Sequence, residues 1–269
     1  MKMVMHAPST ELGEAHTPAL QPLWDYVRSE QRDVLLSPYL PATCAFLTHV
    51  LFCAPFLALD ALGSVNQRVR MWRIAAGSGP PPSVQEWGAC LRRVLGRYLS
   101  AVLPATALLQ ALRSPSLPEL APSCWQLFVE VFACFLLFDT VFFMWHFSMH
   151  RIPWLYSNIH QLHHRHHTPF ALMAQDATSA ELLSLLLLAL GSAWAVGCHP
   201  LSEALFHLFN SWLAVEDHCG YNLPWALHRL LPCLGGAPHH QVHHHQHRGN
   251  YAPYFTHWDQ LFGTYRSAE

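Results

Sequence analysis

The sequence predicts an all-α protein whose helices cross a membrane several times as one bundle. Hydrophobic residues make up 52% of its 269 residues and charged residues only 12%, whereas a soluble domain usually carries about 25% charged residues. Several apolar runs approach the length of about 20 residues that a membrane-spanning helix needs. No stretch alternates apolar and polar residues as a half-buried strand would. The net charge of −2 is too balanced to favour a nucleic-acid partner.

The chain divides into a polar lead and a membrane-embedded domain. Residues 1–38 contain charged residues and prolines in place of a long apolar run, and one short helix is expected at 24–36. Residues 39–269 form the second domain, in which we expect every spanning helix and the functional site. Glycine and proline at 77–82 and three prolines within 114–123 predict loops between the first spans.

Five apolar runs are candidates for the spanning helices. Residues 39–62 and 124–145 are long enough despite internal polar and proline positions, whereas 98–112 is shorter and weaker. The leucine-rich run 181–198 and the run 201–215 meet at a proline, so we expect a helical hairpin that turns there. Each run alone would also suit a buried helix of a soluble protein. Together with the low charge, the five runs favour a membrane.

Arginine placement predicts how these spans are oriented. Six arginines lie between the first two runs, which marks that loop as cytosolic: Arg68, Arg70, Arg73, Arg92, Arg93 and Arg97. Counting spans forward returns residues 146–180 and 216–269 to the same side. These two regions hold the regularly spaced histidines of the chain, so the sequence predicts that those histidines face the cytosol.

Eight cysteines are scattered along the chain without a C-x-x-C pair. We interpret Cys44, Cys53 and Cys134, which lie inside apolar runs, as buried packing thiols. The spacing therefore predicts no disulfide framework.

Histidines in the second half of the chain recur with a regular spacing. One H-x-x-x-H pair at 146–150 and two H-x-x-H-H triplets at 160–164 and 240–244 accompany a lone histidine at 218. Because a helix turns by about 100° per residue, each pair or triplet lies on one face and can aim several imidazoles at one point. The predicted metal ligands are His146, His150, His160, His163, His164, His218, His240, His243 and His244. Apolar segments separate these boxes, unlike a contiguous histidine-rich tract.

Four further residues are weaker members of the predicted site. His239 abuts the third box, and Asn222 stands four residues after His218, so either is a candidate for an additional ligand. Asp217 beside His218 and Asp139 inside an apolar run are candidates for holding a ligand or lining the substrate cavity. The plainer alternative for Asp139 is a pairing with a neighbouring polar group.

The ligand set favours a pair of iron ions. Imidazole suits zinc, copper, iron and nickel, but structural zinc takes four ligands and usually includes cysteine. Nine or ten nitrogen ligands suit two six-coordinate ions with positions left open for oxygen. No side chain beyond the metal ligands is predicted to be catalytic. We interpret the extra histidines beside the boxes as solvated: His166, His167, His245 and His247.

The stretches around the boxes resemble a known family. The boxes H-F-S-M-H, H-Q-L-H-H and H-Q-V-H-H are similar to those of the fatty acid hydroxylase superfamily, which contains sterol hydroxylases and desaturases. The members that hydroxylate the cholesterol side chain at carbon 25 resemble this chain most, through L-Q-P-L-W-D, W-H-F-S-M-H-R-I-P-W-L-Y, V-E-D-H-C-G-Y-N-L-P-W and N-Y-A-P-Y-F-T-H-W-D-Q-L-F-G-T. The likeness covers about residues 20–265 and is strongest after 138.

This resemblance implies a multi-pass monooxygenase of the endoplasmic reticulum membrane with two irons facing the cytosol, ligated by the nine histidines. The substrate would be cholesterol and the product 25-hydroxycholesterol, with O2 as co-substrate. Electrons would come from NADPH through a separate membrane electron-transfer protein, of the cytochrome b5 or reductase type. The chain itself contains no G-x-G-x-x-G or P-loop with which to bind a dinucleotide.

Two other functions are compatible with these residues. Another sterol or lipid hydroxylase or desaturase of the superfamily would carry the same boxes, because the substrate cavity decides the outcome. A zinc or copper transporter would also use histidines, although its ionisable residues would be spread through the spans. Four aromatic residues are candidates for a sterol path, with lipid-facing or core packing as the alternative: Phe142, Phe143, Trp145 and Trp212.

Overall fold

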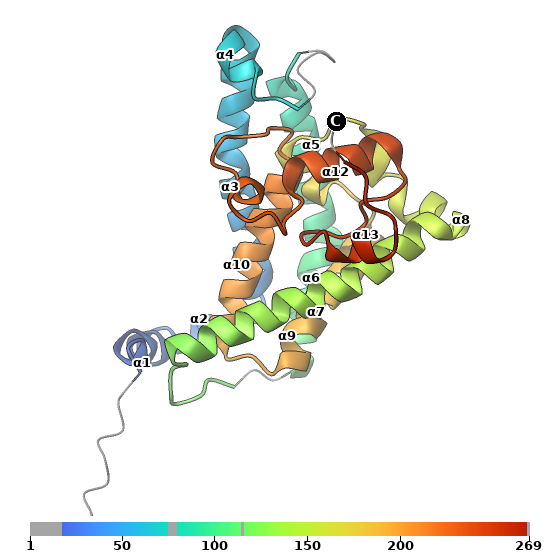
Figure 1. Ribbon diagram of the computed structural model, residues 1–269. Coiled ribbons are helices and arrows are strands. Elements are labelled where there is room, and N and C mark those ends of the chain that lie inside the picture. The colour runs from blue at the N-terminus through green and yellow to red at the C-terminus, as the bar shows by residue number, and fades with distance from the viewer. Residues whose placement is uncertain (1–17, 75–79, 114–115, 268–269) are drawn as a thin grey trace, which may run out of the picture.

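The computed structural model describes three stretches of the chain, residues 18–74, 80–113 and 116–267. Long helices cross one another as a bundle, and most of the shorter helices gather toward one end of it (Figure 1). The described residues form no β-strand, and only two isolated backbone bridges occur among them, Arg73–Tyr221 and Leu234–Phe255. The prediction of an all-α protein is therefore confirmed.

The N-terminal segment packs onto the body of the protein through one tryptophan. Its short helix is broken into α1 (Gln21–Glu30) and α2 (Arg32–Leu35). Trp24 is 1% exposed, and its Nε1 donates a hydrogen bond to the carbonyl of Pro118 at 2.8 Å. Much of the predicted polar lead, residues 1–17, lies outside the described residues. The boundary between lead and membrane domain therefore stays a prediction.

Four helices are long and apolar enough to cross a membrane. They are α3 (Leu40–Val65), the continuous helix Val84–Arg113, α7 (Cys124–Arg151) and α9 (Ser179–Val196). No more than 33% of any of these apolar stretches is buried inside the protein. Their outward surfaces carry large apolar side chains, such as Leu51 at 66% and Phe128 at 57% exposure. Because such surfaces are stable against lipid and not against water, the chain is a multi-pass membrane protein.

The second span is longer than the sequence suggests. It joins three pieces into one helix: α5 (Val84–Arg97), the π-turn η1 (Tyr98–Val102) and α6 (Leu103–Arg113). The weak run at 98–112 marks only its second half, because α5 carries charged side chains on one face. A capping box starts α5: Ser83 Oγ accepts from the Glu86 N–H, and the Glu86 carboxylate accepts from the Ser83 N–H.

The predicted helical hairpin is present between α9 and α10 (Pro200–Asp217). Gly197 ends α9 in the left-handed region at φ 73°, and Pro200 stands in the first turn of α10, so the chain reverses within a short turn. α10 packs against both α3 and α7. It carries the lone His218 to the same end of the bundle as the short helices (Figure 1).

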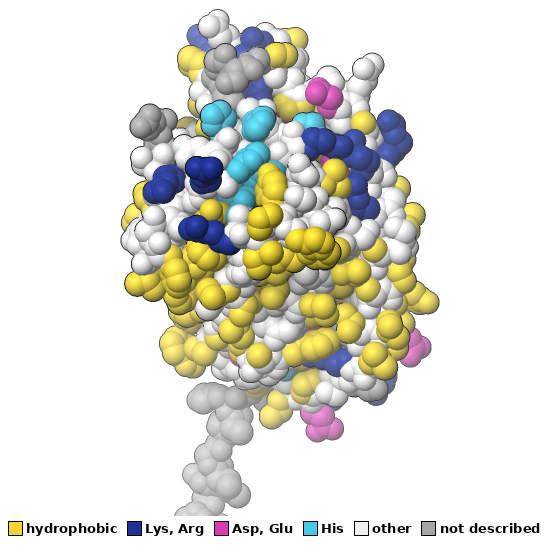
Figure 2. Space-filling model, turned by 90° about the vertical axis from the view of Figure 1, so that its right-hand side faces the viewer, with side chains coloured by type: hydrophobic (Ala, Val, Ile, Leu, Met, Phe, Trp, Pro, Cys, Tyr) yellow, Lys and Arg dark blue, Asp and Glu magenta, His cyan; other side chains and the backbone are white. Residues whose placement is uncertain are grey.

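Short elements build the end of the bundle where the histidines gather. They are α4 (Gln67–Arg70), α8 (Pro153–Leu155), η2 (Tyr156–His160), η3 (His163–Arg165), η4 (Ala171–Gln175), α11 (Leu227–Leu230), α12 (Gly236–Gln246) and α13 (His257–Leu261). The face in Figure 2 shows histidine and arginine side chains together over this end, whereas hydrophobic side chains dominate the rest. The apolar helices thus form a scaffold with one polar, histidine-bearing cap.

Two of the three predicted packing thiols are buried. Cys53 and Cys134 are 2% and 0% exposed, but Cys44 is exposed, so the prediction is wrong for Cys44. Nine residues of helix turn by about 900°, which places Cys44 and Cys53 on opposite faces of α3. An apolar run alone does not distinguish the inner face of a spanning helix from its lipid-facing side.

Candidate metal centre

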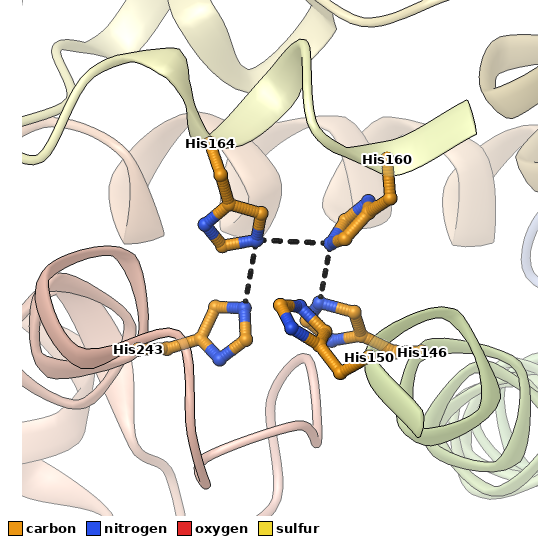
Figure 3. A group of neighbouring side chains, drawn as sticks. All are labelled: His146, His150, His160, His164 and His243. Atoms are coloured by element: carbon orange, nitrogen blue, oxygen red, sulfur yellow. Dashed lines mark hydrogen bonds between the residues drawn. The ribbon is translucent and has the colours of Figure 1, made fainter. Parts of the chain in front are cut away.

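Five histidines from four elements meet at one point (Figure 3). They are His146 and His150 of α7, His160 of η2, His164 of η3 and His243 of α12. One nitrogen from each ring lies within 4.8 Å of a nitrogen of every other. His160 Nε2 is 3.0 Å from His146 Nε2 and 2.9 Å from His164 Nε2, and His164 Nε2 is 3.1 Å from His243 Nε2.

A second cluster of four histidines adjoins the first. It consists of His163 of η3, His218 after α10, and His240 and His244 of α12. His218 Nε2 is 3.1 Å from His163 Nε2 and 2.9 Å from His240 Nε2, and the Nε2 atoms of His240 and His244 are 3.1 Å apart. These nitrogens also lie within 4.8 Å of one another.

The two clusters share their supporting elements. His163 and His164 are consecutive on η3 yet turn to different clusters, and on α12 His243 faces one cluster while His244 faces the other. The ring centroids of His164 and His244 are 4.6 Å apart, so the two candidate sites are neighbours. The structure therefore brings all nine histidines named from the sequence into one two-part arrangement, which has the form of a two-metal site.

Backbone carbonyls determine which nitrogen carries the hydrogen in three of these rings. His146 Nδ1 donates to the carbonyl of Tyr251 at 2.7 Å, His218 Nδ1 to that of Ala214 at 2.8 Å, and His243 Nδ1 to that of Gly249 at 2.8 Å. A carbonyl oxygen only accepts hydrogen bonds, so Nδ1 carries the hydrogen in each ring. In a neutral imidazole the other nitrogen, Nε2, is then left with a lone pair, and here it points into a cluster.

The inward lone pairs make each cluster fit a cation. His160 Nδ1 donates to the Glu181 carboxylate at 2.8 Å, which leaves a lone pair on His160 Nε2 as well. That atom is 3.0 Å from Nε2 of His146, so with the hydrogen of each ring on Nδ1 two lone pairs face each other. Two lone pairs at this distance repel each other, and a metal ion that accepts both removes the repulsion. The donor set, imidazole nitrogen without thiolate, suits a transition metal.

Burial keeps the rings in the neutral form that binds metal. Removal from water lowers the pKa of His163 to about 3 and that of His218 to about 4. The same cause lowers the pKa well below 6.5 for the other histidines that lie outside the spans: His160, His164, His240, His243 and His244. The charged form of a buried imidazole has lost its hydration, so these groups are unprotonated at neutral pH and their lone pairs are free.

Glu181 is a residue of the site that the sequence analysis did not single out. It lies in the first turn of α9, is 2% exposed, and its carboxylate is the acceptor for His160. Thr178 fixes this turn, because its Oγ1 accepts from the Glu181 N–H and donates to the carbonyl of Ile159 beside His160. The available signal was a single acid within the apolar stretch 179–196, a feature that marks a functional position in a membrane helix.

Asp259 supports the site through the backbone, and it too was missed. Its carboxylate accepts from the N–H groups of Tyr251 and Ala252 at 2.8 and 2.9 Å. It thereby holds the loop whose Tyr251 carbonyl orients His146. Asp259 is fully buried in α13. Its carboxylate also accepts from Thr264 Oγ1 at 2.7 Å. The N–H groups of Tyr251 and Ala252 belong to the main chain, so no side-chain pattern in the sequence could reveal that contact.

The two acids proposed from the sequence occupy other positions. Asp139 Oδ1 accepts from the N–H groups of Tyr254 and Phe255 at 3.1 and 3.0 Å, so this acid anchors the C-terminal loop to α7 and contacts no histidine of the clusters. Its Oδ2 is buried without a partner among the described residues. Asp217 is buried at the end of α10 beside His218, and no hydrogen bond to a histidine of either cluster is present.

His239 and Asn222 lie outside both clusters. His239 Nε2 is 3.6 Å from Asp259 Oδ2, and His239 belongs to neither group of converging histidines. The side-chain oxygen of Asn222 accepts from Arg229 Nε at 2.9 Å and faces His228 Nε2 at 3.1 Å. The H-x-x-x-N spacing does not bring Asn222 to the cluster, because α10 ends at Asp217 and Asn222 falls in the following loop.

Two of the four extra histidines, His167 and His247, line a cavity that borders the first cluster. The cavity has a volume of about 420 Å³, and its lining includes His164 of the cluster together with Arg165, His167 and His247. The rings of His167 and His247 stack at 5.4 Å. His166 and His245 are exposed, which agrees with the interpretation of solvated side chains. Most of the lining residues have polar side chains, Ser157, Asn158 and Gln161 among them.

Two of the four candidate path aromatics touch the site. Phe142 lies 5.3 Å from the ring of His146, and Trp145 lies 5.8 Å from that of His160. Phe143 instead packs in the core. Its ring centroid is 6.0 Å from that of Trp258 in α13 and 5.1 Å from that of Phe262, which follows α13. Trp212 packs against α3, with Phe52 and Phe56 as neighbours at 5.4 and 6.1 Å.

Comparison of the sequence with known proteins identifies the family. Residues 131–264, which contain all nine clustered histidines, match the family model described as fatty acid hydroxylase. The chain belongs to the fatty acid hydroxylase family. It is 44% identical to human cholesterol 25-hydroxylase over 252 residues, which is 93% of this chain and 91% of the human protein. The mouse cholesterol 25-hydroxylase is also 44% identical, over 96% of this chain and 86% of the relative.

A more distant relative carries a different name. The methylsterol monooxygenase of Aspergillus fumigatus is 34% identical over 83% of this chain and 76% of its own length. No solved structure is significantly similar to the chain. Family membership therefore rests on the sequence, and the arrangement of the two histidine clusters comes from the structure described above.

Proposed function

We propose that this chain is a sterol monooxygenase that hydroxylates the side chain of cholesterol at carbon 25 and releases 25-hydroxycholesterol. Two relatives at 44% identity over most of the chain are named for this reaction. The structural observation that carries the proposal is the pair of adjoining histidine clusters whose lone pairs face inward. A hydroxylase that inserts one oxygen atom into an unactivated carbon needs such a redox-active centre.

The proposed cofactor is a pair of iron ions, one in each cluster. Bound iron would supply the activation of O2 that this reaction requires, which zinc, without redox chemistry, does not. The proposed ligands are His146, His150, His160, His164 and His243 for one ion and His163, His218, His240 and His244 for the other. His239 is left out because it belongs to neither group of converging histidines, and Asn222 because its side-chain oxygen accepts from Arg229.

The chain's own residues hold this centre in place. Glu181 and the carbonyls of Ala214, Gly249 and Tyr251 accept from Nδ1 of four rings, so each ring keeps its orientation and its inward lone pair. Eight of the nine clustered histidines are at most 7% exposed, and His146 of α7 is one of them at 2%. This burial excludes bulk water from the reacting atoms.

The sterol is proposed to reach the centre from the bilayer along α7. Phe142 and Trp145 are partly buried between the histidines and the outer face of this helix, and both rings touch ligand rings. Met144 on the adjacent face is 52% exposed. Aromatic and apolar side chains at this point suit the hydrocarbon tail that carries carbon 25.

Electrons are proposed to arrive from the opposite side, from NADPH through a membrane redox protein such as cytochrome b5 or a reductase. A cavity of about 420 Å³ borders His164, and the exposed Arg165 in its lining offers positive charge to an acidic partner. This requires the histidine-bearing end to face the cytosol, in the endoplasmic reticulum membrane. The catalytic domain is proposed to span 39–269, after a lead at 1–38.

Product analysis tests the proposal. Membranes that contain the protein are incubated with cholesterol, O2 and a reductant, and the products are identified by mass spectrometry. We expect 25-hydroxycholesterol with wild-type protein and none with His163→Ala or His164→Ala. Metal analysis of the purified protein should find about two irons per chain; zinc alone would favour the transporter alternative and contradict the proposed chemistry.

Oxidation of sterol methyl groups is a second candidate, because one relative at 34% identity is named methylsterol monooxygenase. The same incubation with a 4-methylsterol separates the two activities. A product oxidised on the ring methyl, with cholesterol left unchanged, would replace the proposed substrate while leaving the metal site intact.

A further inference from the structure

Two cysteines meet at the end of the bundle opposite the histidines. Cys134 lies on α7 and Cys198 in the turn between α9 and α10, 64 residues apart in the chain. Their Sγ atoms are 3.1 Å apart, and the residues are 0% and 9% exposed. An S–S bond is about 2.05 Å long, so a relative movement of about 1 Å would join them.

The turn holds Cys198 in this position independently of the sulfur contact. Gly197 in the left-handed region ends α9, and the Cys198 N–H donates to the carbonyl of Ala193 at 3.2 Å. One helical turn before Cys134, the Glu130 carboxylate accepts from the His199 N–H at 3.0 Å. The backbone of the turn is thus hydrogen-bonded to α7 next to the two sulfurs, which keeps the two cysteine side chains close together.

We propose that Cys134 and Cys198 are joined by a disulfide bond in the native protein. Each thiol loses one proton and one electron, the S–S bond forms, and a protein disulfide of a thiol–disulfide oxidoreductase accepts the two electrons and two protons and is reduced to a dithiol. Such oxidation occurs in the lumen of the secretory pathway. The turn between α9 and α10 lies at the far end of the bundle from α12 (Figure 1), so a cytosolic metal centre places it on the lumenal side.

The bond would connect the scaffolds of both metal sites. α7 carries His146 and His150 of the first cluster, and α10, which follows Cys198 directly, leads to His218 of the second. Apolar side chains from α9 and α10, Ala189 and Phe206 among them, pack around the cysteines. A covalent link there fixes the spacing of α7 and the α9–α10 hairpin in lipid, where packing between helices is only weakly driven.

Mass spectrometry of the full-length protein tests the bond directly. Membranes are solubilised and denatured in the presence of N-ethylmaleimide, digested without reductant, and analysed for linked peptides. We expect a peptide pair that joins Cys134 to Cys198 and disappears on reduction, while Cys53, Cys90 and Cys219, which are buried and free, are fully alkylated. Alkylation of both Cys134 and Cys198 without prior reduction would overturn the proposal.

Serine variants distinguish a bond from two separate packing roles. Cys134→Ser and Cys198→Ser should lower the thermal midpoint by similar amounts, and the double variant should fall no further, because either change removes the same bond. Cys44→Ser is the control, since this side chain is exposed and should leave the midpoint unchanged. Additive decreases in the double variant would contradict the disulfide.

The orientation needs a separate readout, because the proposal rests on it. The chain contains no N-x-S/T sequon, so one introduced within 116–119, before α7, reports whether this end of the bundle enters the lumen. Free thiols with a glycosylated sequon would overturn the disulfide alone. Free thiols without glycosylation would overturn the disulfide and the orientation together, whereas a linked pair without glycosylation would support the disulfide and overturn the orientation.

Discussion

Replacing Glu181 with alanine should weaken metal binding without touching any proposed ligand. The Glu181 carboxylate accepts the hydrogen of His160 Nδ1 at 2.8 Å, and both side chains are 2% exposed. After the change, water cannot readily replace the lost acceptor in so buried a position. The ring then either leaves a buried donor unpaired or turns and presents its N–H to the metal.

The size of the effect follows from the buried donor. An unsatisfied buried hydrogen-bonding group costs about 1–3 kcal/mol, and each 1.4 kcal/mol is about tenfold in affinity. Glu181→Ala should therefore weaken iron binding by about 5- to 150-fold, which overlaps the 10- to 100-fold that loss of such outer partners typically costs. Glu181→Gln keeps an oxygen acceptor but loses the charge, so its loss should be smaller, about fivefold.

Metal titration of the purified apoprotein measures these affinities, and product formation measures the activity. The control is Glu203→Ala: Glu203 pairs with Arg113 at the start of α10, and His218 lies at that helix's other end. Its metal affinity should equal that of the wild type. Wild-type iron affinity and activity in Glu181→Ala would refute the role assigned to this carboxylate. An equal loss of iron affinity in Glu181→Gln and Glu181→Ala would show that the acceptor oxygen kept by glutamine does not matter.

Three further expectations follow from the same geometry. His163→Ala and His164→Ala remove neighbouring ligands from different clusters, so each should bring the metal content from two ions toward one and abolish hydroxylation; two tightly bound ions in both variants would contradict the assignment. Burial lowers the pKa of His163 to about 3 and of His218 to about 4, whereas the unfolded chain titrates near 6.5. The folded apoprotein therefore binds fewer protons, and its thermal midpoint should fall as the pH drops from about 6.5 to 4 but stay constant above about 7.5; a midpoint independent of pH in the acidic range would show that these rings are not buried and neutral. Asp176 is 1% exposed and accepts from Arg97 Nη1 at 2.7 Å and from Arg93, so Asp176→Asn should lower the free energy of unfolding by about 2 kcal/mol, reduced from the value for a fully buried pair because both arginines are partly exposed. Arg113→Gln breaks the pair with Glu203, whose carboxylate is more exposed than that of Asp176, and should lower the free energy of unfolding by less than about 1 kcal/mol. Equal decreases for the two variants in chemical denaturation would contradict this ranking.

The histidine spacing predicted which residues meet, but not how they are divided. On α12, His240 and His244 are four residues apart and share a face, as the helical repeat requires, and both join the second cluster. His163 and His164 were expected to act within one box. Consecutive side chains diverge on η3, a short 3-10 turn, and His243 and His244 diverge likewise on α12, so each triplet supplies both clusters. The spacing does not show which cluster each ring joins, because that depends on how the elements pack.

The partners of the histidines depend on distant parts of the chain. Tyr251 lies 105 residues after His146, and Glu181 lies 21 residues after His160. Asn222 shows the converse: its spacing from His218 imitates a ligand pair, yet the end of α10 places it with Arg229. Spacing predicts contacts only while one helix continues through both positions.

The sequence by itself determined the α-helical class, the membrane setting and the identity of the nine clustered histidines. These properties depend on composition and on the helical repeat, which are local and therefore readable along the chain. Only the tertiary structure decided the grouping into five and four, the carbonyls and the carboxylate that orient the rings, and the approach of Cys134 to Cys198. Each of these requires segments far apart in the chain to pack at a fixed distance, and helix packing sets that distance through the shapes of all the side chains between them.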